Sequence, residues 1–172
     1  MDGFLGGKIF KTALFFVIYV NSPKNDCKMS LIANILSRKG RHAISVTPDT
    51  TVIDALRIMA EKNIGSIVVM SGDKYLGIIT ERDYSRKVIL KGKHSDETKV
   101  SEIMSTDLPS VTPGDTVEQC MQIMSDKNIR YLPVFENERL TGIISMSDVV
   151  KETILLQQAT ISHLESYIHS GA

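Results

Sequence analysis

The chain has 172 residues, of which 42% are apolar and 23% charged, a balance typical of a folded globular protein. Lys plus Arg number 20, as do Asp plus Glu, and this net charge of zero argues against a general nucleic-acid binder. The two cysteines, Cys27 and Cys120, form no C-x-x-C pair, which argues against a disulfide framework or a structural zinc site.

Residues 1–28 differ from the rest of the sequence. Lys8 and Lys11 precede an apolar stretch over 12–20, which resembles a short signal sequence or membrane anchor, but no small-residue cleavage site follows. Alternatively, the folded protein starts at Met29 and residues 1–28 are an atypical extension, or they form an N-terminal strand. No apolar run reaches the roughly 18–20 residues that span a bilayer. We therefore predict a cytoplasmic protein, with membrane association through residues 9–20 as the alternative.

An internal repeat is the main evidence on the fold. Residues 46–83 align without a gap with residues 111–148 at a shift of 65. Both copies begin with Val-Thr-Pro and share turn residues as well as core residues. Such a repeat predicts two units of one fold, packed about a pseudo-twofold axis.

The predicted elements follow the same order in both units: strand, helix, strand, strand, helix. A short strand over 44–47 or 110–112 ends at proline, which cannot donate to a sheet. The next helix starts after a threonine cap, Thr51 or Thr116, and ends at Asn63 or Asn128. A hairpin and a second helix complete each unit, and the first of these helices is expected over 82–91.

The expected fold is therefore a mixed α/β (α+β) module whose two β-α-β-β-α repeats pack sheet to sheet. We divide the chain into an extension over 1–28, a first domain over 29–95, a second domain over 96–159 and a separate C-terminal helix over 160–172. The last boundary rests on Thr160, a candidate helix cap.

A polar motif ends the hairpin of each unit. Its pattern is G-x-x-[T/S]-x-x-D, from Gly77 to Asp83 and from Gly142 to Asp148. The aspartate falls in the first turn of the next helix, where the helix dipole stabilises a carboxylate that can hold a vicinal diol such as that of ribose. The alternative is a simple helix cap, but two copies in register favour a ligand-binding role for Asp83 and Asp148.

Residues beside the motif suggest an apolar pocket for a flat ring. Glycine at Gly77 and Gly142 allows close approach to the backbone. The neighbouring strand residues expected to enclose a purine are Ile44, Val46, Ile67, Val111 and Leu132.

The repeat resembles the CBS-domain pair, a regulatory module named after cystathionine beta-synthase, over about residues 31–168. The Val-Thr-Pro starts, Leu132-Pro133-Val134 and both G-x-x-[T/S]-x-x-D ends carry the resemblance. It implies an adenosyl ligand: AMP, ADP, ATP, NAD or S-adenosylmethionine. By matching position, Asp83 and Asp148 would hold the ribose, with Thr80 and Ser145 at the ribose and first phosphate.

The two copies differ in the cationic residues that could bind a phosphate. Arg82 has Ser147 as its counterpart, and Arg130 has Gly65. Both arginines are candidates for the ribose and phosphate region, and whether they reach one cleft is left open. Neither a catalytic constellation nor a metal-binding cluster is evident, so we predict a non-enzymatic protein without a catalytic cofactor or metal.

The C-terminal stretch carries an apolar stripe that favours a homodimer, a common assembly for CBS pairs. Leu31, Ile32 and Ile35 are expected to add to this surface, whose other members are Val150, Ile154, Ile161, Leu164 and Ile168. The expected function is a sensor that binds an adenine nucleotide and acts on a separate partner protein, without nucleic-acid binding. The alternative is a structural dimerisation and interaction module whose ligand sites are empty or degenerate. The sequence does not decide between ligands, name the partner or establish whether residues 1–28 are genuine.

Overall fold

The computed structural model describes residues 31–170, and its mixed α/β fold confirms the predicted class. One sheet has the order β1 (Ser45–Val46), β2 (Ser66–Ser71) and β3 (Lys74–Thr80), and the second pairs β4 (Tyr131–Glu136) with β5 (Arg139–Ser145). The α-helices are α2 (Ile32–Lys39), α3 (Val52–Lys62), α4 (Glu81–Lys87), α5 (Val117–Asp126) and α6 (Met146–Ser170). Short 3₁₀ helices are η1 (Ile89–Lys91) and η2 (Val100–Glu102).

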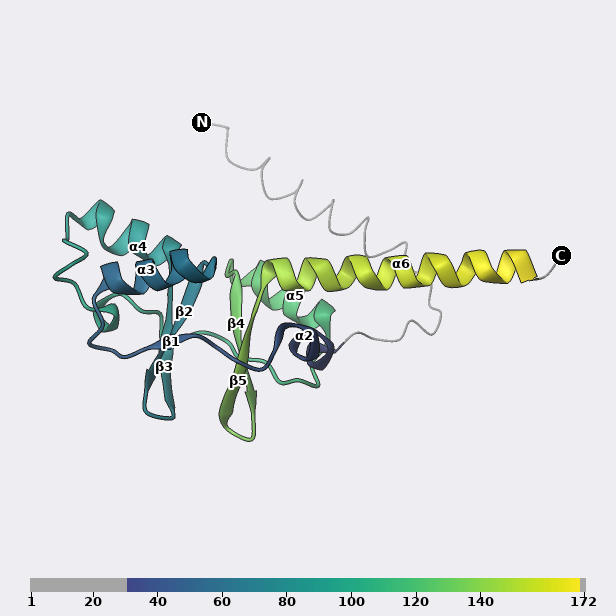
Figure 1. Ribbon diagram of the computed structural model, residues 1–172, viewed down its shortest axis with the longest axis horizontal. Coiled ribbons are helices and arrows are strands. Elements are labelled where there is room, and N and C mark those ends of the chain that lie inside the picture. The colour runs from purple at the N-terminus through teal and green to yellow at the C-terminus, as the bar shows by residue number, and fades with distance from the viewer. Residues whose placement is uncertain (1–30, 171–172) are drawn as a thin grey trace, which may run out of the picture.

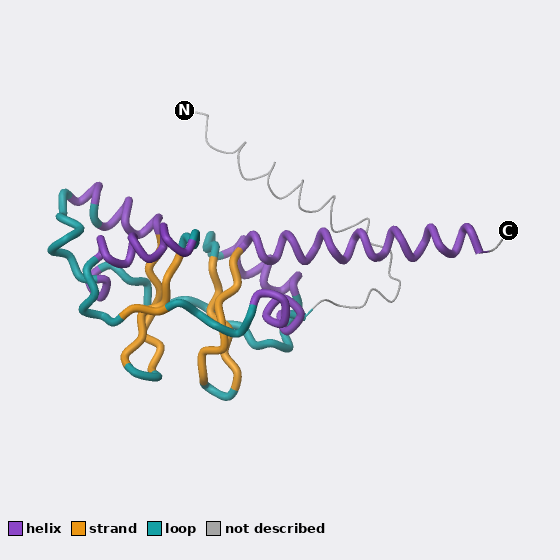
Figure 2. Tube along the Cα trace, viewed as in Figure 1, coloured by secondary structure: helices purple, strands orange, loops and turns teal. Residues whose placement is uncertain are grey.

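The two hairpins form as predicted, and both have the same irregularity at equivalent positions of the repeat. The register shifts between Val69 and Met70 in one hairpin and between Val134 and Phe135 in the other, positions that differ by the repeat length. The hairpins lie side by side with both turns at one edge (Figure 2), and the rings of Tyr75 and Phe135 meet edge to face at 5.4 Å. This contact joins the two repeats near the turns.

The predicted helix caps of the first helix in each repeat are also confirmed. The Thr51 hydroxyl accepts a hydrogen bond from the backbone N–H of Asp54 before α3, and Thr116 forms a capping box with Gln119 before α5. Asn63 and Asn128 adopt left-handed conformations with φ of 51° and 53°. These local signals position both helices against their hairpins.

The core of each repeat is completed by a segment that lies, in the sequence, just before the other repeat. From α2, which precedes the first repeat, Ile32 and Leu36 are buried among residues of α5, β4 and β5. From the segment of η2, which precedes the second repeat, Val100 and Ile103 are buried with residues of α3, β2 and β3. The exchange is visible in Figure 1, where α2 lies beside α5 and β5. The two repeats are thus joined reciprocally, as a pseudo-twofold arrangement requires.

Several boundaries differ from the prediction. The first strand is reduced to β1, and its counterpart is a single parallel bridge between Val111 and Val134. Helix α4 ends at Lys87 and is followed by η1, because Val88 turns into the core of the first repeat.

The separate C-terminal helix is also a wrong prediction. Helix α6 runs unbroken from Met146 to Ser170 and extends well past the sheets (Figure 1). The hydroxyl of Thr160 donates to the carbonyl of Leu156 inside the helix and therefore caps nothing. Ile32 and Ile35 are 0% and 4% exposed in the second core, so they cannot add to a dimer surface as predicted.

Candidate functional site

The two G-x-x-[T/S]-x-x-D motifs form the same local structure. In the first, Asp83 Oδ2 accepts from the backbone N–H and the hydroxyl of Thr80 at 3.0 and 2.6 Å. In the second, Asp148 Oδ2 accepts from the same two groups of Ser145 at 2.8 and 2.7 Å. Each aspartate is therefore part of a helix cap, and its second oxygen, Oδ1, is the atom that remains for other partners.

A cavity of about 250 Å³ lies beside the first motif. Thr80, Arg82 and Asp83 line it from the first repeat, and Arg130 lines it from the second. The structure thus answers the question that the sequence left open, since Arg82 and Arg130 face one cavity. Its other lining residues are Gly65, Ile78, Glu81, Arg86, Ser105, Leu108, Asn128, Ile129 and Tyr131.

The carboxylate of Asp83 is positioned by two further polar groups. Its Oδ1 accepts from the Ser105 hydroxyl at 3.3 Å and pairs with the Lys87 ammonium at 2.8 Å. Lys87 also donates to the carbonyl of Ile103 at 2.7 Å. The side chain of Asp83 is only 13% exposed, so its charge lies in a partly desolvated wall of the cavity.

Three arginines supply positive charge to this cavity. Arg82 and Arg86 come from α4, and Arg130 comes from the turn before β4. Arg82 Nη1 donates to the carbonyl of Asn128, whereas Arg86 and Arg130 form no ion pair with a carboxylate among the described residues. Arginine matches the geometry of a phosphate, so the cavity can hold an anionic group next to Asp83.

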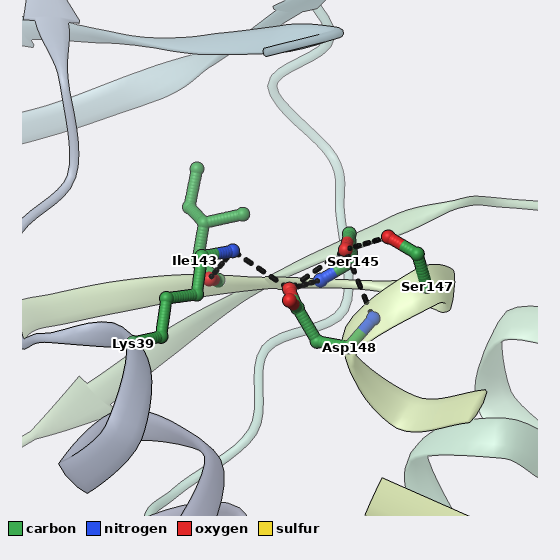
Figure 3. Close-up of polar contacts among 5 residues, drawn as sticks. All are labelled: Lys39, Ile143, Ser145, Ser147 and Asp148. Atoms are coloured by element: carbon green, nitrogen blue, oxygen red, sulfur yellow. Dashed lines mark hydrogen bonds and ion pairs between the residues drawn. The ribbon is translucent and has the colours of Figure 1, made fainter. Parts of the chain in front are cut away.

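The second motif has different surroundings (Figure 3). The Lys39 ammonium, from the end of α2, donates to Asp148 Oδ2 at 2.7 Å and to the carbonyl of Ile143 at 3.2 Å. Ser145 Oγ also lies 2.8 Å from the hydroxyl of Ser147. Burial acts to raise the pKa of Asp148, but Lys39 and Ser145 outweigh it and hold that pKa below its ordinary value.

The five strand residues predicted for the apolar pocket do not line this cavity. Val46 and Ile67 belong to the first core, and Val111 and Leu132 belong to the second, all less than 9% exposed. Ile44 lies outside both cores and outside the cavity lining. The helices cover the strand face on which the prediction placed the purine.

The two motif glycines make room for the exchanged segments. A Cβ on Gly77 would lie 2.6 Å from the carbonyl oxygen of Ser105, and one on Gly142 would lie 2.8 Å from Leu36. Leu36 and Ser105 belong to the segments that precede the first and second repeats. The approach of a flat ring at these glycines stays a prediction.

The residues that do give the cavity apolar walls were missed by sequence reasoning. They are Ile78, Leu108, Ile129 and Tyr131. Ile78 precedes Ile79, and the alternation of a strand sends the two side chains to opposite faces. Tyr131 was detectable as an aromatic residue next to Arg130 whose counterpart is Ser66. A Cβ on Gly65 would meet the Tyr131 hydroxyl at 2.5 Å, so this glycine allows Tyr131 to approach the first repeat.

Comparison with known proteins identifies the family of this repeat. The family model for the CBS domain matches twice, over residues 33–89 and 100–154. The chain belongs to the CBS-domain family. CBS domains are generally regulatory, non-catalytic modules, and these matches indicate no enzyme family.

Relatives of known name and structure agree with this assignment. The chain is 38% identical over 149 residues to the CBS domain-containing protein CBSX3, mitochondrial, of Arabidopsis thaliana, covering 81% of this chain and 72% of the relative. It is 37% identical to the CBS-domain containing protein ATU1752 from Agrobacterium tumefaciens, with a TM-score of 0.69 and coverage of 72% and 99%. It also shares the fold of the CBS domain pair of protein MJ0100, solved in complex with 5′-methylthioadenosine and S-adenosyl-L-methionine, at 24% identity, a TM-score of 0.64 and coverage of 73% and 96%.

The helices within residues 31–170 include none with the length and hydropathy of a membrane span. No group of three or more His, Cys, Asp or Glu side chains in the same range is placed to hold a metal ion. The stretch over 9–20 that suggested an anchor lies outside the described residues.

Proposed function

We propose that this CBS pair is a regulatory module that binds an adenosine-containing ligand and transmits its binding to a separate partner protein. The ligand class comprises AMP, ADP, ATP, NAD and S-adenosylmethionine. The proposal rests on the cavity that is lined by Asp83 of one repeat and by Arg130 of the other.

The cavity offers a separate group for each part of a nucleotide. Asp83 Oδ1 can accept a hydrogen bond from a ribose hydroxyl in place of Ser105 or Lys87, and the arginines can pair with phosphate. Ile78, Leu108, Ile129 and Tyr131 provide an apolar wall for the base. The adenosyl ligands of the MJ0100 pair support the same class here.

Binding at this place would report on the contact between the repeats. The cavity is lined by α4 of the first repeat and by residues 128–131 of the second. A ligand that bridges them would favour the arrangement of repeats that fits it best, by no more than its difference in affinity for the two arrangements. A partner that contacts both repeats would detect this shift.

Calorimetric titration of the full chain with the five ligands in turn tests the proposal. We expect saturable binding of at least one ligand and a loss of about tenfold or more in Asp83→Ala, since a hydrogen bond to a charged group contributes about 1.5–3 kcal/mol. Asp73→Ala, in the exposed turn of the first hairpin, is the matched control and should bind normally. A folded chain that binds none of the five ligands contradicts the proposal.

A second candidate function, a dimerisation and interaction module, is favoured by the surface of α6. Its apolar residues are exposed by 45% to 74%: Val150, Ile154, Leu155, Ile161, Leu164 and Ile168. We propose that this stripe pairs two copies of the chain. If no ligand binds, the interaction module becomes the main function, and its regulated partner is then sought through this helix.

The cytoplasmic location and the absence of nucleic-acid binding remain predictions. The sequence relative CBSX3 is named as mitochondrial. Mass spectrometry of the native N-terminus identifies whether residues 1–28 are retained, and it therefore separates a cleaved targeting segment from a retained extension or anchor.

A further inference from the structure

The second motif differs from the first in the origin of its cation. In the first repeat, Lys87 follows Asp83 by four residues on α4 and pairs with it. At the repeat shift of 65, the counterpart of Lys87 is Glu152 on α6, which carries the opposite charge. The position of α6 that is equivalent to Lys87 therefore provides no lysine for Asp148.

Helix α2 supplies two cations at this place. Lys39 pairs with Asp148, and its neighbour Arg38 pairs with Glu152 one turn further along α6. The Glu152 side chain is 4% exposed, so Arg38 holds a buried carboxylate. Ile32, Ile35 and Leu36 anchor the same helix in the second core. The end of α2 is therefore fixed next to the second motif even if Lys39 moves.

The hydrogen bonds at Asp148 leave little room for a second donor on Oδ2. This oxygen already accepts from the N–H and hydroxyl of Ser145 and from Lys39. A diol that uses both carboxylate oxygens must displace one of these donors. The two Ser145 groups cap α6, whereas the side chain of Lys39 is 41% exposed and can turn into solvent.

We propose that Lys39 is a built-in competitor for the second ligand site, which a ribose can occupy fully only when the Lys39 ammonium leaves Asp148. This inference rests on the proposed function, because it assumes that the second motif binds the same class of ligand. The first motif carries a lysine as well, since Lys87 is 41% exposed and pairs with Asp83 Oδ1. The two motifs differ in the origin of this lysine and in the carboxylate oxygen that it contacts.

Removing Lys39 in a chain whose first site is disabled tests the proposal. In an Asp83→Ala background, Lys39→Met is expected to bind AMP and adenosine about threefold or more tightly, because loss of the competing ion pair frees Asp148. The gain should be equal for both ligands, since the contested group is the diol and not the phosphate. Lys93→Met in the same background is the control, because Lys93 is 42% exposed and pairs with Glu102 away from both motifs.

The outcomes separate the two proposals. If the unsubstituted chain binds AMP but Lys39→Met leaves the Asp83→Ala chain with unchanged, weaker or no binding, the competitor role alone is overturned. If neither the unsubstituted chain nor any Lys39→Met chain binds AMP or adenosine, both proposals fail. A carboxyl NMR titration adds a readout without ligand: Lys39→Met should raise the pKa of Asp148, and an unchanged pKa also overturns the inference.

Discussion

Arg82 Nη1 donates a hydrogen bond to the carbonyl oxygen of Asn128 at 3.2 Å, linking α4 of the first repeat to the left-handed turn after α5 of the second. Arg82, Asn128 and Arg130 all line the same cavity. The ligand site proposed here therefore belongs to the pair of repeats and not to either repeat alone.

Arg130 should discriminate between phosphorylated and neutral ligands. We expect Arg130→Ala to weaken AMP binding about fivefold or more while adenosine binding changes little, because a charged hydrogen bond to the phosphate is lost. Calorimetry with both ligands measures the difference. Arg57→Ala, which removes an exposed arginine paired with Asp54 outside the cavity, should leave both affinities unchanged. Equal weakening of AMP and adenosine by Arg130→Ala would contradict a phosphate role.

The two motif glycines should differ in their tolerance of a methyl group. In Gly77→Ala the new Cβ would meet the backbone oxygen of Ser105, whereas in Gly142→Ala it would meet the end of the Leu36 side chain. We expect Gly77→Ala to lower the free energy of unfolding by about 1–3 kcal/mol and Gly142→Ala to lower it by less. Urea denaturation measures both, with Gly114→Ala as a control whose nearest contact would be 3.8 Å. The opposite order of the two variants would show that the exchanged segments pack differently.

The ion pair between Lys39 and Asp148 should stabilise the fold in a pH-dependent way. The pKa of Asp148 is lower in the folded chain than its ordinary value, so the unfolded chain binds more protons between these two values. This contribution is present above the unfolded pKa, about 3.9, and is lost as the pH falls through the folded pKa. Lys39→Met should therefore show a smaller loss of stability than the unsubstituted chain between pH 5 and pH 2. Urea denaturation across this range checks the sign, and parallel curves for the two proteins would contradict the pairing.

The apolar stripe of α6 should hold two copies of the chain together. Leu164→Asp places a charge among residues exposed by about half or more, and we expect it to convert a dimer to a monomer in sedimentation analysis. Lys151→Asp, also exposed on α6 but outside the stripe, is the control. An unsubstituted chain that sediments as a monomer, or a Leu164→Asp dimer, contradicts this surface.

Local signals in the sequence predicted the repeated elements well. Thr51, Thr116, Asn63 and Asn128 mark helix ends through interactions within a few residues, and all four act as expected. The hairpins follow from apolar runs that flank a turn. These features depend on neighbouring residues, so the sequence contains what is needed to predict them.

The exchange of segments and the cavity walls depend on contacts between distant residues. Nothing local indicates that Leu36 packs over Gly142 or that Ser105 packs over Gly77. Four of the five strand residues predicted for the purine pocket lie instead in the two hydrophobic cores, where they pack against helices. Arg130 was predicted as a cation for a phosphate because it directly precedes a strand of the second repeat, and its glycine counterpart indicated that the two sites differ.

The most direct test of the ligand site is a crystal structure of the full chain grown with saturating AMP. We expect AMP in the cavity between the repeats, with its ribose hydroxyls at Asp83 and its phosphate among Arg82, Arg86 and Arg130. An empty cavity in such a crystal, or AMP bound elsewhere on the chain, would contradict this expectation.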